Sequence, residues 1–139
     1  MKKVKLVIDT NVFLVSLAQK FRLHWIFESL VNGGYDLCIS NDILTEYEEI
    51  IIERYGLEKT SNTLDFLLLL PNVKLISPHY KWNFLEDEDD NKFIDCYVAS
   101  NADFIVSNDK GFNKVKKLEF PKINVISAEE FEIQFKSRL

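Results

Sequence analysis

Four acidic residues occupy positions from which carboxylates can gather into one site. Asp9 follows the apolar run of residues 4–8, Asp109 comes shortly after a second apolar run, and Glu46 and Asp90 lie near the expected starts of two helices. Like charges repel, so such a cluster is costly without a cation, and the hard cations Mg²⁺ and Mn²⁺ prefer oxygen ligands. A site of this kind indicates chemistry on a phosphate ester, and a metal-dependent nuclease is the function it favours.

The elements that must position these acids alternate between strand and helix patterns. Short apolar runs rich in β-branched residues predict strands at residues 4–8, 35–39, 73–76, 103–107 and 123–126. Helical periodicity and capping residues predict helices over residues 12–18, 23–31, 43–55, 60–70, 90–100 and 110–116, and from residue 128 onward. This alternation predicts an α/β fold.

The predicted strands place two of the acids on one edge of the sheet. In an open parallel sheet, ligands bind at the carboxyl ends of the strands. Asp9 and Asp109 are therefore expected on the same edge if their strands are neighbours. Residues 77–88 are expected to form a polar loop that carries aromatic residues.

The two helical acids are selected by their place on the helical wheel. At about 100° per residue, Glu46 lies at the border of the apolar stripe of its helix and faces inward. Asp90 lies near the middle of the apolar stripe of the next acidic helix, whereas Asp95 is turned to one side. Asp90 is therefore favoured as a ligand, and Asp95 is kept as a supporting residue.

Each acid also has an ordinary structural explanation. Glu46 can be a first-turn glutamate stabilised by the helix dipole, and Asp90 can be the N-cap that ends a solvated acidic loop. Asp9 and Asp109 can be turn or capping residues. Only the four acids together point to a metal site.

Composition and charge limit the class of protein. The 139 residues are 47% hydrophobic with four glycines and three prolines, which predicts a single domain over residues 1–139. The longest apolar runs are far below the about 20 residues of a membrane span, so a cytoplasmic protein without membrane contact is expected. Cys38 and Cys96 lie in apolar stretches and are expected to be reduced core residues. The net charge of −5 counts weakly against a broad nucleic-acid surface.

Four motifs carry a resemblance to a known family. They are residues 7–12 (VIDTNV), the acid in residues 44–46 (LTE), residues 89–93 (DDNKF) and residues 102–109 (ADFIVSND). Each motif alone is weak, but their order and spacing over residues 4–127 make the set specific. The chain resembles PIN-domain ribonucleases, in particular the branch that acts as the toxin component of toxin–antitoxin pairs.

The resemblance implies a fold, a site and partners. It implies a three-layer α/β/α sandwich with a parallel central sheet, and an acidic quartet that binds Mg²⁺ or Mn²⁺ to cut single-stranded RNA. By motif position the quartet is Asp9, Glu46, Asp90 and Asp109, with Asn11 and Ser107 in supporting roles. Asp89 and Asp95 stay open as alternatives to Asp90. A toxin would have an antitoxin protein as its partner, and a homodimer fits the family.

Other functions and contacts remain open. The lysines that can line a groove for the RNA backbone are Lys81, Lys92, Lys110, Lys114, Lys116 and Lys117, and Tyr80 or Trp82 can stack on a base. The main alternative function is a non-catalytic PIN-like module that binds protein or RNA. A phosphatase of the haloacid-dehalogenase type is a further alternative, but such enzymes carry a second aspartate where this chain has Asn11. His24 and His79 have no spacing that indicates a catalytic triad.

Overall fold

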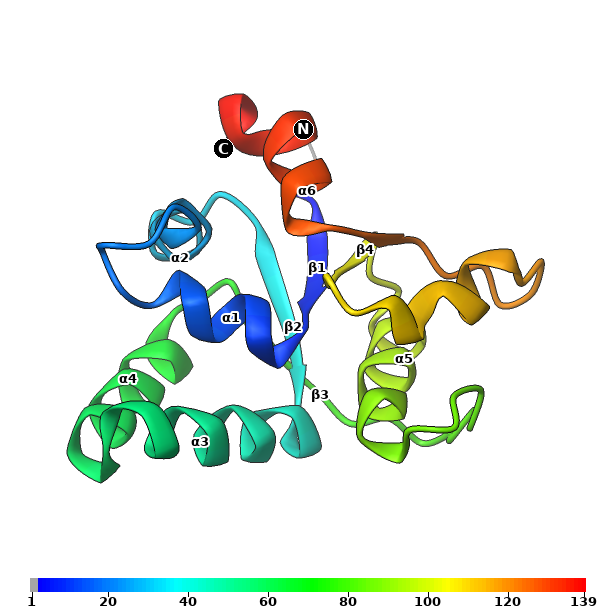
Figure 1. Cartoon of the computed structure of the whole chain (residues 1–139), viewed down its shortest axis with the longest axis horizontal. Helices are drawn as coiled ribbons and strands as arrows, with labels where there is room; N and C mark the ends of the chain where they lie inside the picture. Colours follow the sequence, from blue (N-terminus) through cyan, green and yellow to red (C-terminus); the bar gives the residue numbers. More distant parts are fainter. Residues whose placement is uncertain (1–2) are drawn as a thin grey trace.

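Five parallel strands form the centre of the molecule (Figure 1). The computed structural model describes residues 3–139. The strands are β1 (Lys5–Ile8), β2 (Asp36–Ser40), β3 (Val73–Ile76), β4 (Phe104–Val106) and β5 (Val125–Ile126), in the spatial order β3-β2-β1-β4-β5. Every neighbouring pair is parallel. The predicted α/β fold with a parallel sheet is confirmed.

Helices cover both faces of this sheet. They are α1 (Thr10–Ser16), α2 (His24–Val31), α3 (Asn41–Tyr55), α4 (Leu57–Leu69), α5 (Glu88–Ser100) and α6 (Ala128–Phe135), with the 3₁₀ helices η1 (Lys110–Lys117) and η2 (Lys136–Arg138). The chain passes from β1 to β3 in one direction through α1–α4 and returns through α5 to β4. Right-handed crossovers in opposite directions place these helices on opposite faces. Accordingly, α5 packs against β1, β2, β3 and β4, while α1–α4 lie together on the other side (Figure 1).

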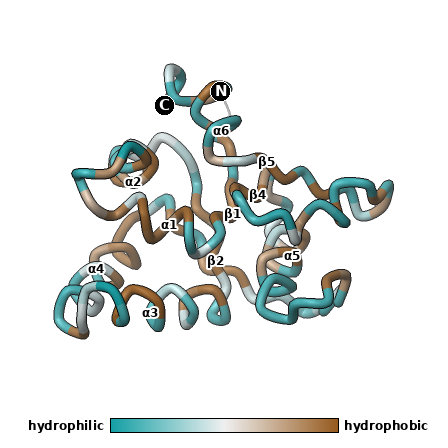
Figure 2. Tube along the Cα trace, in the orientation of Figure 1, coloured by the Kyte–Doolittle hydropathy of each residue, from teal (hydrophilic) through white to brown (hydrophobic). Residues whose placement is uncertain are grey.

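Core contacts pack α3 against the carboxyl end of β1. Figure 2 shows hydrophobic stretches gathered around the central strands, with hydrophilic stretches toward the periphery. Tyr47 of α3 is fully buried and stacks on Phe13 of α1, with ring centroids 4.3 Å apart. Its hydroxyl donates a hydrogen bond to the carbonyl of Ile8, the last residue of β1. This contact holds Glu46, the residue before Tyr47, beside Asp9.

Several predicted helix boundaries are wrong, and two of them concern the acids. α3 begins at Asn41, where the Ser40 hydroxyl accepts the Ile43 amide, so Glu46 lies in the second turn rather than the first. α5 begins at Glu88, where the Asp87 side chain accepts the Asp89 amide. Asp87 is therefore the N-cap, and Asp90 lies inside the first turn.

The other differences follow from local backbone geometry. α4 begins at Leu57, earlier than predicted, because Gly56 adopts a φ of 87° that lets α3 end and α4 start without a linker. α1 begins at Thr10 and ends at Ser16, also earlier than predicted. The segment after Asp109 is a 3₁₀ helix.

Two compositional predictions concern the cysteines and the membrane. Cys38 and Cys96 are both buried and are not joined by a disulfide, which confirms that they are core residues. Among the helices of residues 3–139, none combines the length and the apolar character needed to cross a bilayer.

Candidate metal centre

Asp9 and Asp109 lie on the same edge of the sheet, as predicted, because β1 and β4 are adjacent. The Asp9 amide continues the ladder by donating to the Val106 carbonyl at 3.0 Å. Strand order reverses between β1 and β4, and ligands of open parallel sheets bind at such a switch point. Ser107 links the two acids: its hydroxyl donates to Asp9 Oδ2 at 2.8 Å and accepts the Asp109 amide at 3.0 Å.

Asp109 and Asp90 face each other across Gly111. The Gly111 amide donates to Asp109 Oδ1 at 2.8 Å. A Cβ atom at Gly111 would lie 3.2 Å from Asp109 Oδ1 and 3.4 Å from Asp90 Oδ2. Both carboxylates therefore approach one point on the backbone, and the lack of a side chain there leaves them room.

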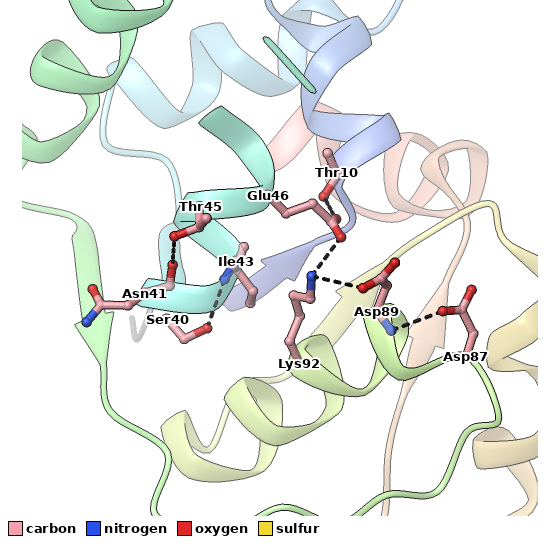
Figure 3. Close-up of polar contacts among 9 residues, drawn as sticks. All are labelled: Thr10, Ser40, Asn41, Ile43, Thr45, Glu46, Asp87, Asp89 and Lys92. Carbon is pink, nitrogen blue, oxygen red and sulfur yellow. Dashed lines mark hydrogen bonds and ion pairs between the residues drawn. The ribbon is translucent and has the colours of Figure 1, made fainter. Parts of the chain in front are cut away.

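Glu46 forms an ion pair with Lys92, a residue that the sequence suggested only as a contact to the RNA backbone. Figure 3 shows Lys92 reaching from α5 toward Glu46 of α3. Lys92 Nζ lies 2.7 Å from Glu46 Oε1 and 3.9 Å from Asp89 Oδ1, and the Thr10 hydroxyl donates to Glu46 Oε2. The Glu46 and Lys92 side chains are only 19% and 17% exposed, so this ion pair is part of the site and not a solvated surface contact.

Burial and mutual repulsion raise the pKa values of two of the acids. Burial is the largest cause that raises the pKa of Asp90 to about 7, and the charges of Asp109, Asp87, Asp9 and Glu46 add to it. The pKa of Asp9 is raised first by burial, against the lowering effect of the Ser107 hydrogen bond, and the charges of Asp109 and Glu46 raise it further. Asp109 and Glu46 are therefore close enough to oppose the ionisation of Asp9 and Asp90.

The donor set fits a hard divalent cation in type and charge. Across residues 3–139, no three His, Cys, Asp or Glu side chains stand close enough together to hold a metal ion as they are arranged, and Glu46 is turned toward Lys92 and Thr10. The four acids nevertheless supply only carboxylate oxygens, which suit Mg²⁺ and Mn²⁺. A cation among them would offset the repulsion that raises the pKa values of Asp9 and Asp90.

Of the three supporting residues, Ser107 and Asn11 lie beside Asp9, whereas Asp95 lies elsewhere. Ser107 contacts Asp9 directly, and the exposed Asn11 lines a groove of about 310 Å³ together with Asp9 and Asp109. Asp95 lies further along α5, where its Oδ1 atom accepts the Trp82 amide at 3.0 Å. Asp95 therefore contacts the loop of residues 77–87, and it lines different grooves from Asp9 and Asp109.

Comparisons of the sequence identify relatives over most of its length. A sequence model described as PIN domain matches residues 5–111. An uncharacterized protein of Methanocaldococcus jannaschii, MJ1680, is 30% identical over 145 residues, which covers 96% of this chain and 92% of that protein.

Two solved structures share the fold. VapBC2 from Rickettsia felis, bound to a DNA fragment from its promoter, matches with a TM-score of 0.63 and 15% identity over 89% of this chain and 98% of that chain. The PIN domain endonuclease Utp24 matches with a TM-score of 0.51 and 18% identity over 88% of this chain and 84% of that chain. At these identities the likeness concerns the arrangement of the chain.

Proposed function

The chain belongs to the PIN domain family, and from this premise we propose that it is a metal-dependent endoribonuclease that cuts single-stranded RNA. One observation carries the proposal. Asp9, Asp90 and Asp109 lie around the switch point of the sheet with Glu46 nearby, and burial and repulsion raise the pKa values of Asp9 and Asp90 there. Perturbed carboxylates that gather at a ligand-binding edge are typical of functional sites.

The side chains around these acids suggest how the site would work. A bound Mg²⁺ or Mn²⁺ would lower the pKa of a water molecule and stabilise negative charge on the phosphate. Asp9, Asp90 and Asp109 would hold the ion, and the Ser107 hydroxyl fixes the orientation of the Asp9 carboxylate. Glu46 would join them on release from Lys92.

Lys92 gives the site a cation of its own. In the ion pair with Glu46 it reduces the repulsion that the acids exert on one another. If Glu46 were to join the ligands of a bound metal ion, the Lys92 ammonium group would be free to attract the phosphate of the RNA. In this mechanism the protein supplies no covalent nucleophile.

We further propose a biological role as the toxin of a toxin–antitoxin pair. The support is the motif resemblance to that branch of the family, together with the shared fold of VapBC2. The role implies an antitoxin protein as a partner, and it is compatible with a homodimer. Co-purification with the protein encoded by an adjacent gene tests the partner.

Cleavage of a labelled single-stranded RNA tests the enzymatic proposal. The wild type, Asp9→Asn, Asp90→Asn and Asp89→Asn are compared with Mn²⁺ or Mg²⁺ and with EDTA. We expect metal-dependent cutting that is lost in Asp9→Asn and Asp90→Asn. Asp89→Asn is the matched control, because Asp89 is the neighbouring acid and its side chain is 82% exposed.

Two results would change the proposal. Cutting that survives Asp90→Asn and is lost in Asp89→Asn would move the ligand role to Asp89. No cutting by the folded, metal-loaded wild type on several RNAs would reject the nuclease and favour a non-catalytic PIN-like module that binds protein or RNA. That second candidate is favoured by one observation, namely that both oxygens of Glu46 already have protein donors in Thr10 and Lys92.

A further inference from the structure

The loop of residues 77–87, which leads from β3 to α5, carries a row of aromatic rings, of which Trp82 and Phe84 are stacked and Tyr80 is tilted against Trp82. Tyr80, Trp82 and Phe84 alternate along it, with ring centroids 5.0 Å apart for Tyr80 and Trp82 and 5.6 Å apart for Trp82 and Phe84. Phe84 and Trp82 are partly buried against the core, whereas Tyr80 is 68% exposed. The row of rings therefore runs from the core to the surface and ends in a ring open to solvent.

A groove of about 650 Å³ lies beside this row of rings. Its walls include Tyr80 and Trp82 from the loop, Leu75 from the edge strand β3 and Val98 from α5. Asp95 supplies the carboxylate of this groove, which Ser77 and His79 also line, and it is only 9% exposed. Within residues 3–139 its one hydrogen bond is the Trp82 amide on Oδ1, although a carboxylate offers about four acceptor positions.

We propose that this groove binds a nucleobase of the single-stranded RNA, with Tyr80 stacked on the face of the base and the Asp95 carboxylate accepting N–H groups from its edge. This inference rests on the proposed function and extends it to substrate recognition. Aromatic rings stack on any base, so Tyr80 supplies affinity without selectivity. The Asp95 carboxylate would select among the bases, because it can only accept hydrogen bonds and so favours a base edge with N–H donors.

Guanine is the base that matches this acceptor best. Its Watson–Crick edge presents two adjacent N–H donors, which can pair with the two oxygens of one carboxylate. Adenine and cytosine present a single amino group beside an acceptor atom, and uracil presents one ring N–H between two carbonyl groups. The groove is therefore expected to prefer guanine and to reject uracil most strongly.

A second groove, of about 270 Å³, shares Asp95 with this one. Its walls also include Lys81 and Lys92, and Lys92 contacts Glu46. The two lysines offer ammonium groups to phosphates there, beside the carboxylates of Asp42 and Glu88. Asp90 and Asp95 are five residues apart on α5, or about 7.5 Å along the helix at about 1.5 Å per residue.

Nucleotide titration of the ¹⁵N-labelled full chain in EDTA, followed by NMR, tests this base site without any cleavage. Guanosine 5′-monophosphate is compared with uridine 5′-monophosphate. We expect the guanosine nucleotide to shift the amide signals of residues 77–87, above all that of Trp82, which donates to Asp95. The uridine nucleotide is expected to bind at least about fivefold more weakly.

Variants separate stacking from base selection. Tyr80→Phe is expected to bind as the wild type does, and Tyr80→Ala about tenfold more weakly, because a stacking ring is lost. Asp95→Asn keeps an oxygen for the Trp82 amide but replaces one acceptor by a donor, so it is expected to lose the preference for guanosine. Ile133→Ala is the matched control, since Ile133 is 75% exposed on α6.

Shifts that fall outside the loop and α5, or equal binding by Tyr80→Ala and the wild type, would overturn the base site. The result is independent of the nuclease. If the chain cuts RNA but shows no nucleotide-induced shifts in the loop, the base site is rejected and the proposed function stands. If the loop binds guanosine nucleotide and no RNA is cut, the base site is supported and the nuclease fails.

Discussion

The amino and carboxyl ends of the strands form two edges of the central sheet, and the surroundings of buried polar groups differ between them. At the amino edge, Asn72 is 4% exposed and its side-chain amide donates to the carbonyls of Leu30 and Tyr35 at 2.8 and 2.7 Å. At the carboxyl edge, the buried Asp9 and the half-buried Asp90 face other acids, and their pKa values are raised. The amino edge pairs the Asn72 amide with two carbonyl groups, whereas the carboxyl edge brings like charges together.

This difference separates stability from function. Paired polar groups at the amino edge stabilise the fold, because an unmade hydrogen bond in the interior is costly. Gathered carboxylates at the carboxyl edge lower the stability of the metal-free protein, and such local costs are tolerated where a site needs them. Substitutions at the two edges are therefore expected to have opposite effects.

The largest effect is expected from Asp109→Asn. Cleavage of RNA should fall at least about 100-fold, because one charged ligand is lost. The metal-free protein should become about 0.5 kcal/mol more stable, because Asp109 raises the pKa values of both Asp9 and Asp90 by repulsion. The asparagine oxygen can still accept the Gly111 amide. Cleavage rates and urea unfolding in EDTA measure the two effects. A variant that is both active and less stable than the wild type would contradict the expected difference between the two edges.

Asn72→Ala should act in the opposite sense at the amino edge. Removal of the amide leaves the buried carbonyls of Leu30 and Tyr35 without that donor, at a cost of about 2 kcal/mol in the free energy of unfolding. Cleavage by the folded variant should match that of the wild type at a temperature well below its unfolding midpoint. Lost cleavage in a folded variant would show that the two edges are coupled.

Lys92→Met tests how far the carboxyl edge is neutralised by its own lysine. Without the ammonium group, Glu46 loses its ion-pair partner, and the acids should bind Mn²⁺ about tenfold more tightly, since a competing cation is gone. The metal-free variant should also be about 1 kcal/mol less stable. Calorimetric titration of Mn²⁺ into wild type and variant gives the affinities. Weaker binding in Lys92→Met would mean that Lys92 helps to position Glu46 for the metal.

The smallest effect is a pH dependence of stability in EDTA. The pKa of Asp90 is near 4 in the unfolded chain and about 7 in the folded protein, so the folded protein holds a proton that the unfolded chain has released. The free energy of unfolding should therefore fall as the pH rises from about 4 to about 7. Asp90 is partly exposed, so solvent screening limits the contribution to about 1 kcal/mol. Asp90→Asn should remove this part of the slope in urea unfolding, and an unchanged slope would contradict the raised pKa.

The carboxyl edge was predictable where the backbone alone positions a residue. Asp9 and Asp109 follow short β-branched runs, and a parallel sheet brings the ends of such runs to one edge. The inward side of Glu46 followed from the helical period, which holds although α3 begins earlier than predicted. Local pattern was sufficient in these cases because each residue is placed by its own strand or helix.

Features that depend on contacts between elements were not predictable. The reach of Lys92 from α5 to Glu46 on α3, and the hydrogen bond from Thr10 to Glu46, depend on how the elements pack. Asp95 was expected beside the acids, but the irregular loop of residues 77–87 folds back onto it. The direction of an irregular loop has no periodic signal in the sequence, so only the structure could show the aromatic groove.

Binding of Mn²⁺ to the metal-free protein, followed by titration calorimetry at pH 7.5, tests whether the acids at the carboxyl edge form one divalent-cation site. We expect the wild type and Asn72→Ala to bind Mn²⁺ equally, and Asp9→Asn and Asp109→Asn to bind it at least about tenfold more weakly. Equal Mn²⁺ affinity in all four proteins, each shown to be folded, would contradict such a site.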